Sequence, residues 1–268
     1  KVELRAILDG AFDTAAFDYR LTADFASFGK EGFENVRAGG RGRLSPQPII
    51  VPLQLSVSRV TGVDAVAGAI LRNLVLQGTL RVTSAFITGA DLKFQSDKLK
   101  GSFNLLVDLK NGRFDVGLNG GLARYLIPGL GIVDVVSKLQ VVPAPNGKGA
   151  RIIGTATAQF VRLDNSFFRT LAGGLPRLTA NLEQSTDGIL HLRNLVLTAP
   201  DIRITGTGFR QRNGSVTFEG SGTQRTYGPL TIKLVGRLER PMLDLTFARP
   251  NETLGVNKVR AHLDPTPE

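Results

Sequence analysis

The sequence predicts a mainly β protein with two short helices, on three observations. Apolar and polar residues alternate with a period of two along most of the 268-residue chain. The Asn-Gly pairs Asn111-Gly112 and Asn213-Gly214 separate such runs and are strong short hairpin signals. The chain holds 31 glycines and no Trp, which suits a sheet with many turns better than a core built on large aromatics. We count about 15 strands.

The alternating runs follow one another from the first residues. Val2, Leu4 and Leu8 share one face of the first run, and Glu3 and Arg5 share the other. The apolar faces of later runs are Phe17, Tyr19, Leu21, Ala23 and Phe25; Ile49, Val51, Leu53, Leu55 and Val57; Leu74, Leu76, Leu80 and Val82; Leu99, Phe103, Leu105, Val107 and Leu109; Ile152, Ala156, Ala158 and Phe160; and Leu230, Ile232 and Leu234. Each run therefore predicts a strand with one apolar face.

Two segments have helical spacing instead. Residues 63–71 place apolar side chains three and four apart, with Thr61 as the N-cap and Asp64 three residues later. Residues 166–172 form the second helix, which Asn165 or Asp164 would cap and the glycine pair at 173–174 would end.

An internal echo organises the chain. The hexapeptide Leu71-Arg-Asn-Leu-Val-Leu76 recurs as Leu192-Arg-Asn-Leu-Val-Leu197, and the helix starts and the Asn-Gly turns recur in the same order. This order indicates two diverged units of helix plus antiparallel strands, with extra residues near 178–188 in the second. The predicted divisions are an N-terminal β segment 1–60, a first unit 61–163, a second unit 164–250 and a polar tail 251–268.

The composition argues against an enzyme. The absence of cysteine excludes disulfides and thiolate metal sites, and only His191 and His262 could serve a histidine-based site. His191 stands at a predicted strand start, where a structural role is the simpler interpretation. The carboxylates have no metal-loop spacing, and the Gly-rich stretches lack the helix that a phosphate loop needs. We expect no enzyme activity, no metal and no cofactor.

The net charge of +10 comes mostly from Lys and Arg that alternate with apolar residues, which predicts a solvated sheet face. The densest run, Arg37-Ala-Gly-Gly-Arg41-Gly-Arg43, is expected to form a hairpin tip. It lacks the aromatic residues that single-stranded nucleic acid would stack on, so no nucleic-acid partner is expected.

The apolar strand faces must leave water, and three architectures achieve this. The sheet can close into a barrel, pack as a sandwich, or line a groove filled by an apolar ligand, and periodicity is compatible with each. A membrane barrel would carry aromatic girdles, against which three Tyr and no Trp argue.

Three stretches carry a resemblance to the AsmA-like group of proteins, which includes TamB and YdbH. They are Tyr125-Leu-Ile-Pro-Gly-Leu-Gly-Ile-Val-Asp134; Leu195-Val-Leu-Thr-Ala-Pro200 with Ile202-Arg-Ile-Thr-Gly206; and Phe218-Glu-Gly-Ser-Gly222 with Tyr227-Gly-Pro-Leu230. The sequence resembles this group over roughly residues 50–250, and the shared motifs are structural rather than catalytic.

The resemblance implies a long, curled antiparallel sheet forming an apolar-lined groove. It also implies phospholipid transport between the inner and outer membranes, in the periplasm, by a protein tethered to the inner membrane; this chain would be one segment of it. The expected partners are phospholipid acyl chains, the two membranes and a candidate outer-membrane protein. The groove lining would comprise Leu74, Leu76, Leu80, Val82, Phe103, Leu105, Val107, Ile152, Phe160, Ile202, Ile204, Leu230, Ile232 and Leu234.

Two alternative functions are compatible with the same sequence pattern. An assembly factor for outer-membrane proteins would use a sheet edge to template an incoming strand. A closed β-sandwich binding domain would bury the same apolar faces in a dry core.

Overall fold

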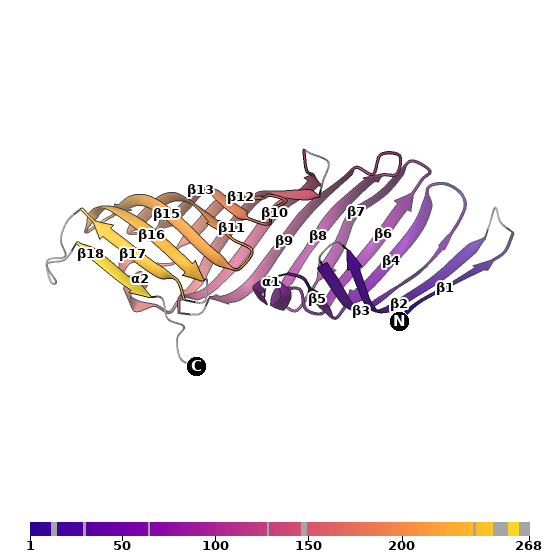
Figure 1. Ribbon diagram of the computed structural model, residues 1–268, viewed down its shortest axis with the longest axis horizontal. Helices are drawn as coiled ribbons and strands as arrows, with labels where there is room; N and C mark the ends of the chain where they lie inside the picture. Colours follow the sequence, from indigo (N-terminus) through magenta and orange to yellow (C-terminus); the bar gives the residue numbers. More distant parts are fainter. Residues whose placement is uncertain are drawn as a thin grey trace. The chain divides into compact units, whose positions relative to one another are not determined.

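A computed structural model of the protein describes residues 1–11, 15–28, 31–63, 65–127, 129–145, 149–237, 240–248 and 257–262. In these residues 18 strands belong to one sheet, which is not closed into a barrel, and there are two short helices (Figure 1). The predicted long antiparallel sheet with two helices is thus confirmed, with more strands than the roughly 15 that hairpin signals indicate.

The chain divides into two compact units, which we describe separately. Unit 1 comprises Lys1–Gly121 and Gln140–Pro143, and unit 2 comprises Leu122–Leu139 and Ala144–Glu268. The divisions at residues 60, 163 and 250, which rest on the internal echo, stay a prediction.

The strands and helices follow one another along the chain. The first are β1 (Val2–Asp9), β2 (Ala16–Phe28), β3 (Glu31–Arg43), β4 (Ile49–Val57), β5 (Arg59–Thr61), α1 (Ala65–Ile70), β6 (Leu74–Val82), β7 (Phe86–Gln95) and β8 (Leu99–Asp108). Both units share β9 (Phe114–Ile127) and β10 (Gly131–Pro143). Unit 2 continues with β11 (Ala150–Leu163), α2 (Ser166–Ala172), β12 (Arg177–Gln184), β13 (Leu190–Ala199), β14 (Ile202–Arg210), β15 (Ser215–Gln224), β16 (Gly228–Arg237), β17 (Met242–Phe247) and β18 (Lys258–His262).

Antiparallel pairing of successive strands places most of the apolar residues of unit 1 on one face, which we call its inner surface. Directly opposed residues of an antiparallel pair lie on the same face of the sheet. One such row crosses six strands and consists of Leu4, Leu21, Ala38, Leu55, Leu76 and Phe94. The strand β3 pairs with both β4 and β5, so these two short strands continue one another along it.

The same logic defines the inner surface of unit 2. One row across seven strands consists of Ala158, Leu178, Leu197, Ile204, Gly222, Leu230 and Phe247. The neighbouring outer rows carry Thr, Arg, Glu and Lys, and the outer surface is therefore polar.

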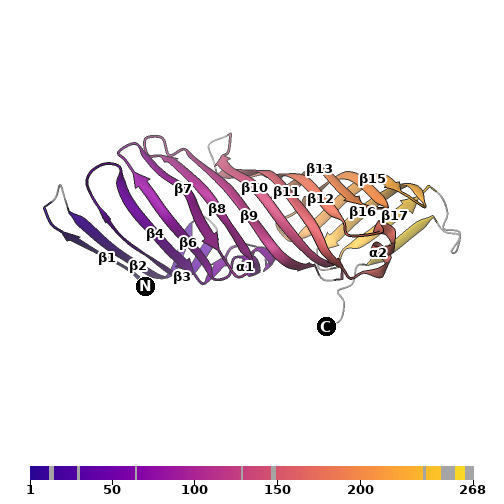
Figure 2. The ribbon, with the colours of Figure 1, turned by 180° about the vertical axis from the view of Figure 1, so that it is seen from behind.

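The sheet of unit 2 curls around its own inner surface. Strands β15–β17 lie in front of β10–β12 in Figure 1 and behind them in Figure 2, as opposite walls. Val133 of β10 and Phe160 of β11 belong to the same buried cluster as Leu230, Leu243 and Leu245. Burial of these aliphatic side chains drives the curl, at roughly 25 cal/mol per Å² of apolar surface removed from water.

The helix α2 lies at one rim of unit 2, at the lower edge of both views (Figures 1 and 2). Its N-cap is Asn165, whose side chain accepts a hydrogen bond from the backbone N–H of Phe168, and it ends at Gly173 with φ of 65°. Both features follow the sequence prediction. Leu171 and Ala172 are buried in the core of the unit.

A buried polar side chain holds each helix at its rim, and we call these two residues the rim latches. In unit 2 the Gln224 amide donates to the carbonyl of Leu171 at 3.3 Å, and its Oε1 accepts from the N–H groups of Thr226 and Tyr227. In unit 1 the Ser96 hydroxyl donates to the carbonyl of Ile70 at 2.6 Å. Its oxygen likewise accepts from backbone N–H groups of the following turn.

Three details differ from the sequence-based expectation. The Arg37–Arg43 run is not a hairpin tip, because it lies within β3. Its glycines make room for cross-strand rings: a Cβ at Gly40 would meet Tyr19, and one at Gly42 would meet Phe17.

The other two details concern α1 and the tail. Thr61 ends β5 instead of capping α1, and Asp64 lies outside the described residues. The predicted tail holds strand β18, while its residues 251–256 and 263–268 are likewise outside the described part.

The repeated hexapeptide marks two left-handed backbone positions. Asn73 has φ of 53° and Asn194 has φ of 50°. Asn194 forms a bulge that shifts the register of β13 between Leu192 and Leu195, and Asn73 immediately precedes β6. The strand β6 follows α1 directly, whereas β12 intervenes between α2 and β13, which is the extra segment that the sequence indicated.

Replacement of the rim latches is expected to destabilise the protein. Gln224→Ala removes the hydrogen bonds to the carbonyl of Leu171 and from the N–H of Thr226. Because these backbone groups then lack a partner, the free energy of unfolding should fall by about 1–3 kcal/mol. Thr223→Ala, on the exposed outer surface of the same strand, is the control, with an expected change within about 0.5 kcal/mol. Denaturant titration measures both, and equal midpoints would contradict the latch.

The bulge residue Asn194 gives a second prediction. Asn194→Gly should leave stability nearly unchanged, because glycine adopts positive φ freely. Asn194→Val should lower the free energy of unfolding by at least about 1–2 kcal/mol, which is the cost of a β-branched residue in the left-handed region, and so lower the melting temperature. Thermal unfolding of both variants checks this, and an equally stable Val variant would show that the bulge is not required.

Candidate functional site

The candidate site is the inner surface of each unit, because all fourteen residues predicted to line a groove lie on it. In unit 1 they are Leu74, Leu76, Leu80, Val82, Phe103, Leu105 and Val107, brought together by the pairing of β6, β7 and β8. All seven are half-buried, so each retains surface that another apolar molecule can cover.

In unit 2 the predicted residues fall into two groups. Phe160, Ile202, Ile204 and Leu230 are 3–8% exposed and already packed by protein near α2. Ile152, Ile232 and Leu234 lie farther from α2 and are half-buried. The first group forms the protein core of unit 2, and only the second retains surface for a ligand.

The difference arises from the two rims of unit 2. At the rim near α2, the helix and the β15–β16 turn cover the inner surface, and Leu230 is 3% exposed. Toward the opposite rim no helix covers it in the described residues, and Ile232 and Leu234 become partly exposed along the same strand. The inner surface is therefore closed at one rim and open at the other.

Sequence alternation missed inner-surface residues that follow bulges. Asp91, with φ of 53°, shifts the register of β7, so Leu92 joins the inner surface although Gly89 precedes it by an odd number of residues. Leu92 is fully buried, because it fills the space above Gly78 and Gly89. A non-glycine residue with positive φ has no clear signature in a period-two pattern, although Asp and Asn are the residue types enriched there.

Few polar side chains interrupt the inner surface in the described residues. Tyr19 donates its hydroxyl to the carbonyl of Pro52 at 2.8 Å, and burial raises the pKa of its phenol, so it stays neutral. Gln224 is occupied as a rim latch. Arg210 lies on the inner surface at the open rim of unit 2, opposite Leu190 and Val216.

The outer surface of unit 2 carries cross-strand ion pairs. Lys233 lies 2.6 Å from Glu219, and Arg193 lies 3.2 Å from Glu183. Arg260 pairs with Asp244, and its hydrogen bond lowers the pKa of that carboxyl. These three pairs are solvent-exposed, and Arg177 and Arg203 on the same surface have no ion-pair partner among the described residues.

Histidines and carboxylates are the side chains of this chain that could hold a metal ion. No group of three or more His, Asp or Glu side chains there has the geometry to hold a metal ion. His191, on the outer surface of β13, stacks near Phe209 with ring centroids 6.5 Å apart. No helix in the described part is long and apolar enough to cross a membrane.

Comparisons with protein-family models, with curated proteins and with solved structures gave no match.

Proposed function

We propose that the protein is a segment of a bridge-like lipid transfer protein. Phospholipid acyl chains would lie on the inner surfaces and move between the inner and outer membranes. The observation that carries this proposal is the apolar inner surface, half-buried in unit 1 and toward the open rim of unit 2, backed by a polar outer surface. Covering such a surface with acyl chains contributes about 0.8 kcal/mol per buried CH₂.

The aliphatic lining suits transfer rather than tight binding. Leu, Ile and Val offer no directional contacts, so an acyl chain loses little when it slides from one row of side chains to the next. The open rim of unit 2 suits the headgroup, because a charged headgroup at an open rim can stay in contact with water while the acyl chains are covered. A periplasmic location, a tether to the inner membrane and an outer-membrane protein partner belong to the same proposal.

One observation favours an assembly factor as the second candidate. All eight residues of β1 are exposed, including Val2 and Leu4 at 67%, and β1 is one end of the series of paired strands. An exposed edge strand of a sheet can pair with an incoming strand by β-augmentation. Lipid that co-purifies with the protein would favour transfer, whereas a captured strand would favour assembly.

Three substitutions on β16 test the lipid path. Ile232→Asp introduces a carboxylate at a half-buried inner position, where an unpaired charge costs several kcal/mol in an apolar medium. Bound phospholipid should fall about tenfold or more while the protein stays folded. Thr231→Asp adds the same group on the exposed outer surface and should retain lipid.

Leu230→Asp supplies the third comparison, because Leu230 is buried in the core near α2 and its carboxylate should unfold unit 2. The measurements are melting temperature and extracted lipid per protein, by mass spectrometry. A folded Ile232→Asp variant with full lipid content would exclude the inner surface as the lipid path. A collapsed melting temperature for Ile232→Asp would favour a closed, dry core.

The proposal also predicts that stability is independent of metals and nucleotides. A specific ligand raises the melting temperature by mass action. We therefore expect the thermal transition to be unchanged by a chelator or by a nucleotide, and a shift of several degrees with either would favour an enzyme instead.

A further inference from the structure

We propose that the outer surface of β1–β4 and β6 in unit 1 docks on a membrane surface rich in anionic phospholipid. We call this area the arginine patch. Its cationic residues are Arg5, Arg20, Arg37, Arg41, Arg43 and Arg81, and all six are exposed. Glu3, Asp9 and Asp18 lie among them, so the patch keeps an excess of positive charge.

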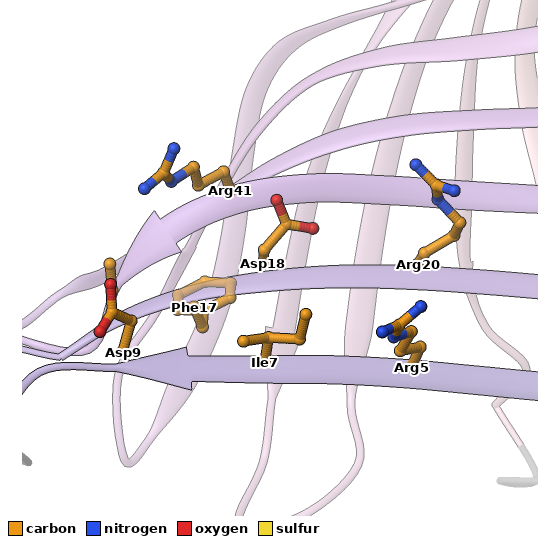
Figure 3. Close-up of a pocket in the computed structure, with 8 residues that line it drawn as sticks. Arg5, Ile7, Asp9, Phe17, Asp18, Arg20 and Arg41 are labelled. Carbon is orange, nitrogen blue, oxygen red and sulfur yellow. The ribbon is translucent and has the colours of Figure 1, made fainter.

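The strand register concentrates these arginines. Arg5 lies directly opposite Arg20, and Ile50 lies opposite both Arg43 and Arg81. Like charges placed directly opposite each other on a sheet are destabilising. Figure 3 shows Arg5 and Arg20 next to each other on neighbouring strands, with Arg41 beyond Asp18.

The arginines of the patch have no ion-pair partner among the described residues. Asp18 is opposite Arg41 in the register, yet no nitrogen–oxygen pair between them comes within ion-pair distance. On the outer surface of unit 2 some cations are paired: Lys233, Arg193 and Arg260 each have a carboxylate partner. An external anion would supply the negative charge that these arginines lack.

The shape and the apolar residues of the patch favour a membrane surface. An open hollow of about 420 Å³ is lined by Arg5, Arg20 and Arg41, together with the carboxylates of Asp9 and Asp18 and the apolar residues Ile7, Ala16 and Phe17. A second hollow of about 750 Å³ is lined by Arg41, Arg43 and Arg81 with Ile50 and three prolines. Ile7 and Ile50 are 52% and 41% exposed.

Arginine forks match lipid phosphates, and exposed aliphatic side chains between them can enter the headgroup region. Single-stranded nucleic acid would instead need several aromatic platforms, whereas Phe17 is the single aromatic residue that lines these two hollows and Tyr19 lies on the inner surface, over Gly40. The patch and the candidate lipid-binding surface are opposite faces of the same strands, so one can be lost without the other.

The test measures binding of the whole chain to vesicles of phosphatidylcholine with and without phosphatidylglycerol. The patch variant is Arg5→Gln/Arg20→Gln/Arg41→Gln, and the control Arg193→Gln/Lys233→Gln/Arg260→Gln removes the same charge from unit 2. At roughly fivefold per arginine, loss of three arginines should weaken the binding of the patch variant to anionic vesicles about 100-fold. The control should stay within about twofold of the unmodified protein.

The melting temperature of the patch variant should not fall, because the substitutions relieve repulsion between Arg5 and Arg20. Ile7→Ser/Ile50→Ser should weaken vesicle binding without changing its salt dependence. Equal losses for the patch variant and the control would overturn the proposal, because net charge alone would then explain binding.

Displacement of vesicles by inorganic phosphate alone would instead identify a free-anion site, and displacement by a single-stranded oligonucleotide at equal charge would identify a nucleic-acid surface. Either result overturns membrane docking. Extracted acyl lipid per protein should be the same for the patch variant and the unmodified protein. This separates failure of the patch from failure of the lipid path.

Discussion

The structure depends on one constraint: every strand has an apolar face that must be kept from water. Unit 2 meets it internally near α2, where curling of the sheet buries Leu230, Leu243 and Leu245 to within a few per cent of full burial. Unit 1 meets it only in part, because Leu76 and Leu105 stay half-exposed on a surface that no second layer of described residues covers. The incompletely covered area is where an apolar ligand has most to contribute, and this links the fold to the proposed function.

The two rim latches show how polar groups stabilise an otherwise apolar surface. Ser96 and Gln224 are the buried polar residues of the described part, and each hydrogen-bonds the end of a helix to a neighbouring turn. The units thus share a device that the hexapeptide echo does not reveal, because serine and glutamine have no sequence similarity. A helix carbonyl that would otherwise be left without a partner explains why a polar side chain is tolerated there.

Much of the fold could be predicted from the sequence, because a sheet with one apolar face leaves a period-two signal in every strand. The α2 boundaries were predictable for a local reason, the Asn165 cap and Gly173. The face of the sheet that forms the candidate site was predictable, but the burial of each residue on it was not. Ile204 and Ile232 have the same sequence pattern, yet only Ile204 is buried by the curl of the sheet. The bulge at Asp91 and the place of Arg37–Arg43 within a strand depend on partners distant in sequence.

The pairing of each strand with its neighbours in the chain has a consequence for how the protein folds and how its length can change. Described pairs such as β13–β14, β14–β15 and β15–β16 join residues close in sequence, so contact order is low and loop-closure entropy is small. Stability then approximates a sum of nearest-neighbour terms, as in solenoid repeats. Gain or loss of a whole hairpin such as β14–β15 preserves the direction and the inward face of every later strand, whereas a single strand would reverse that direction.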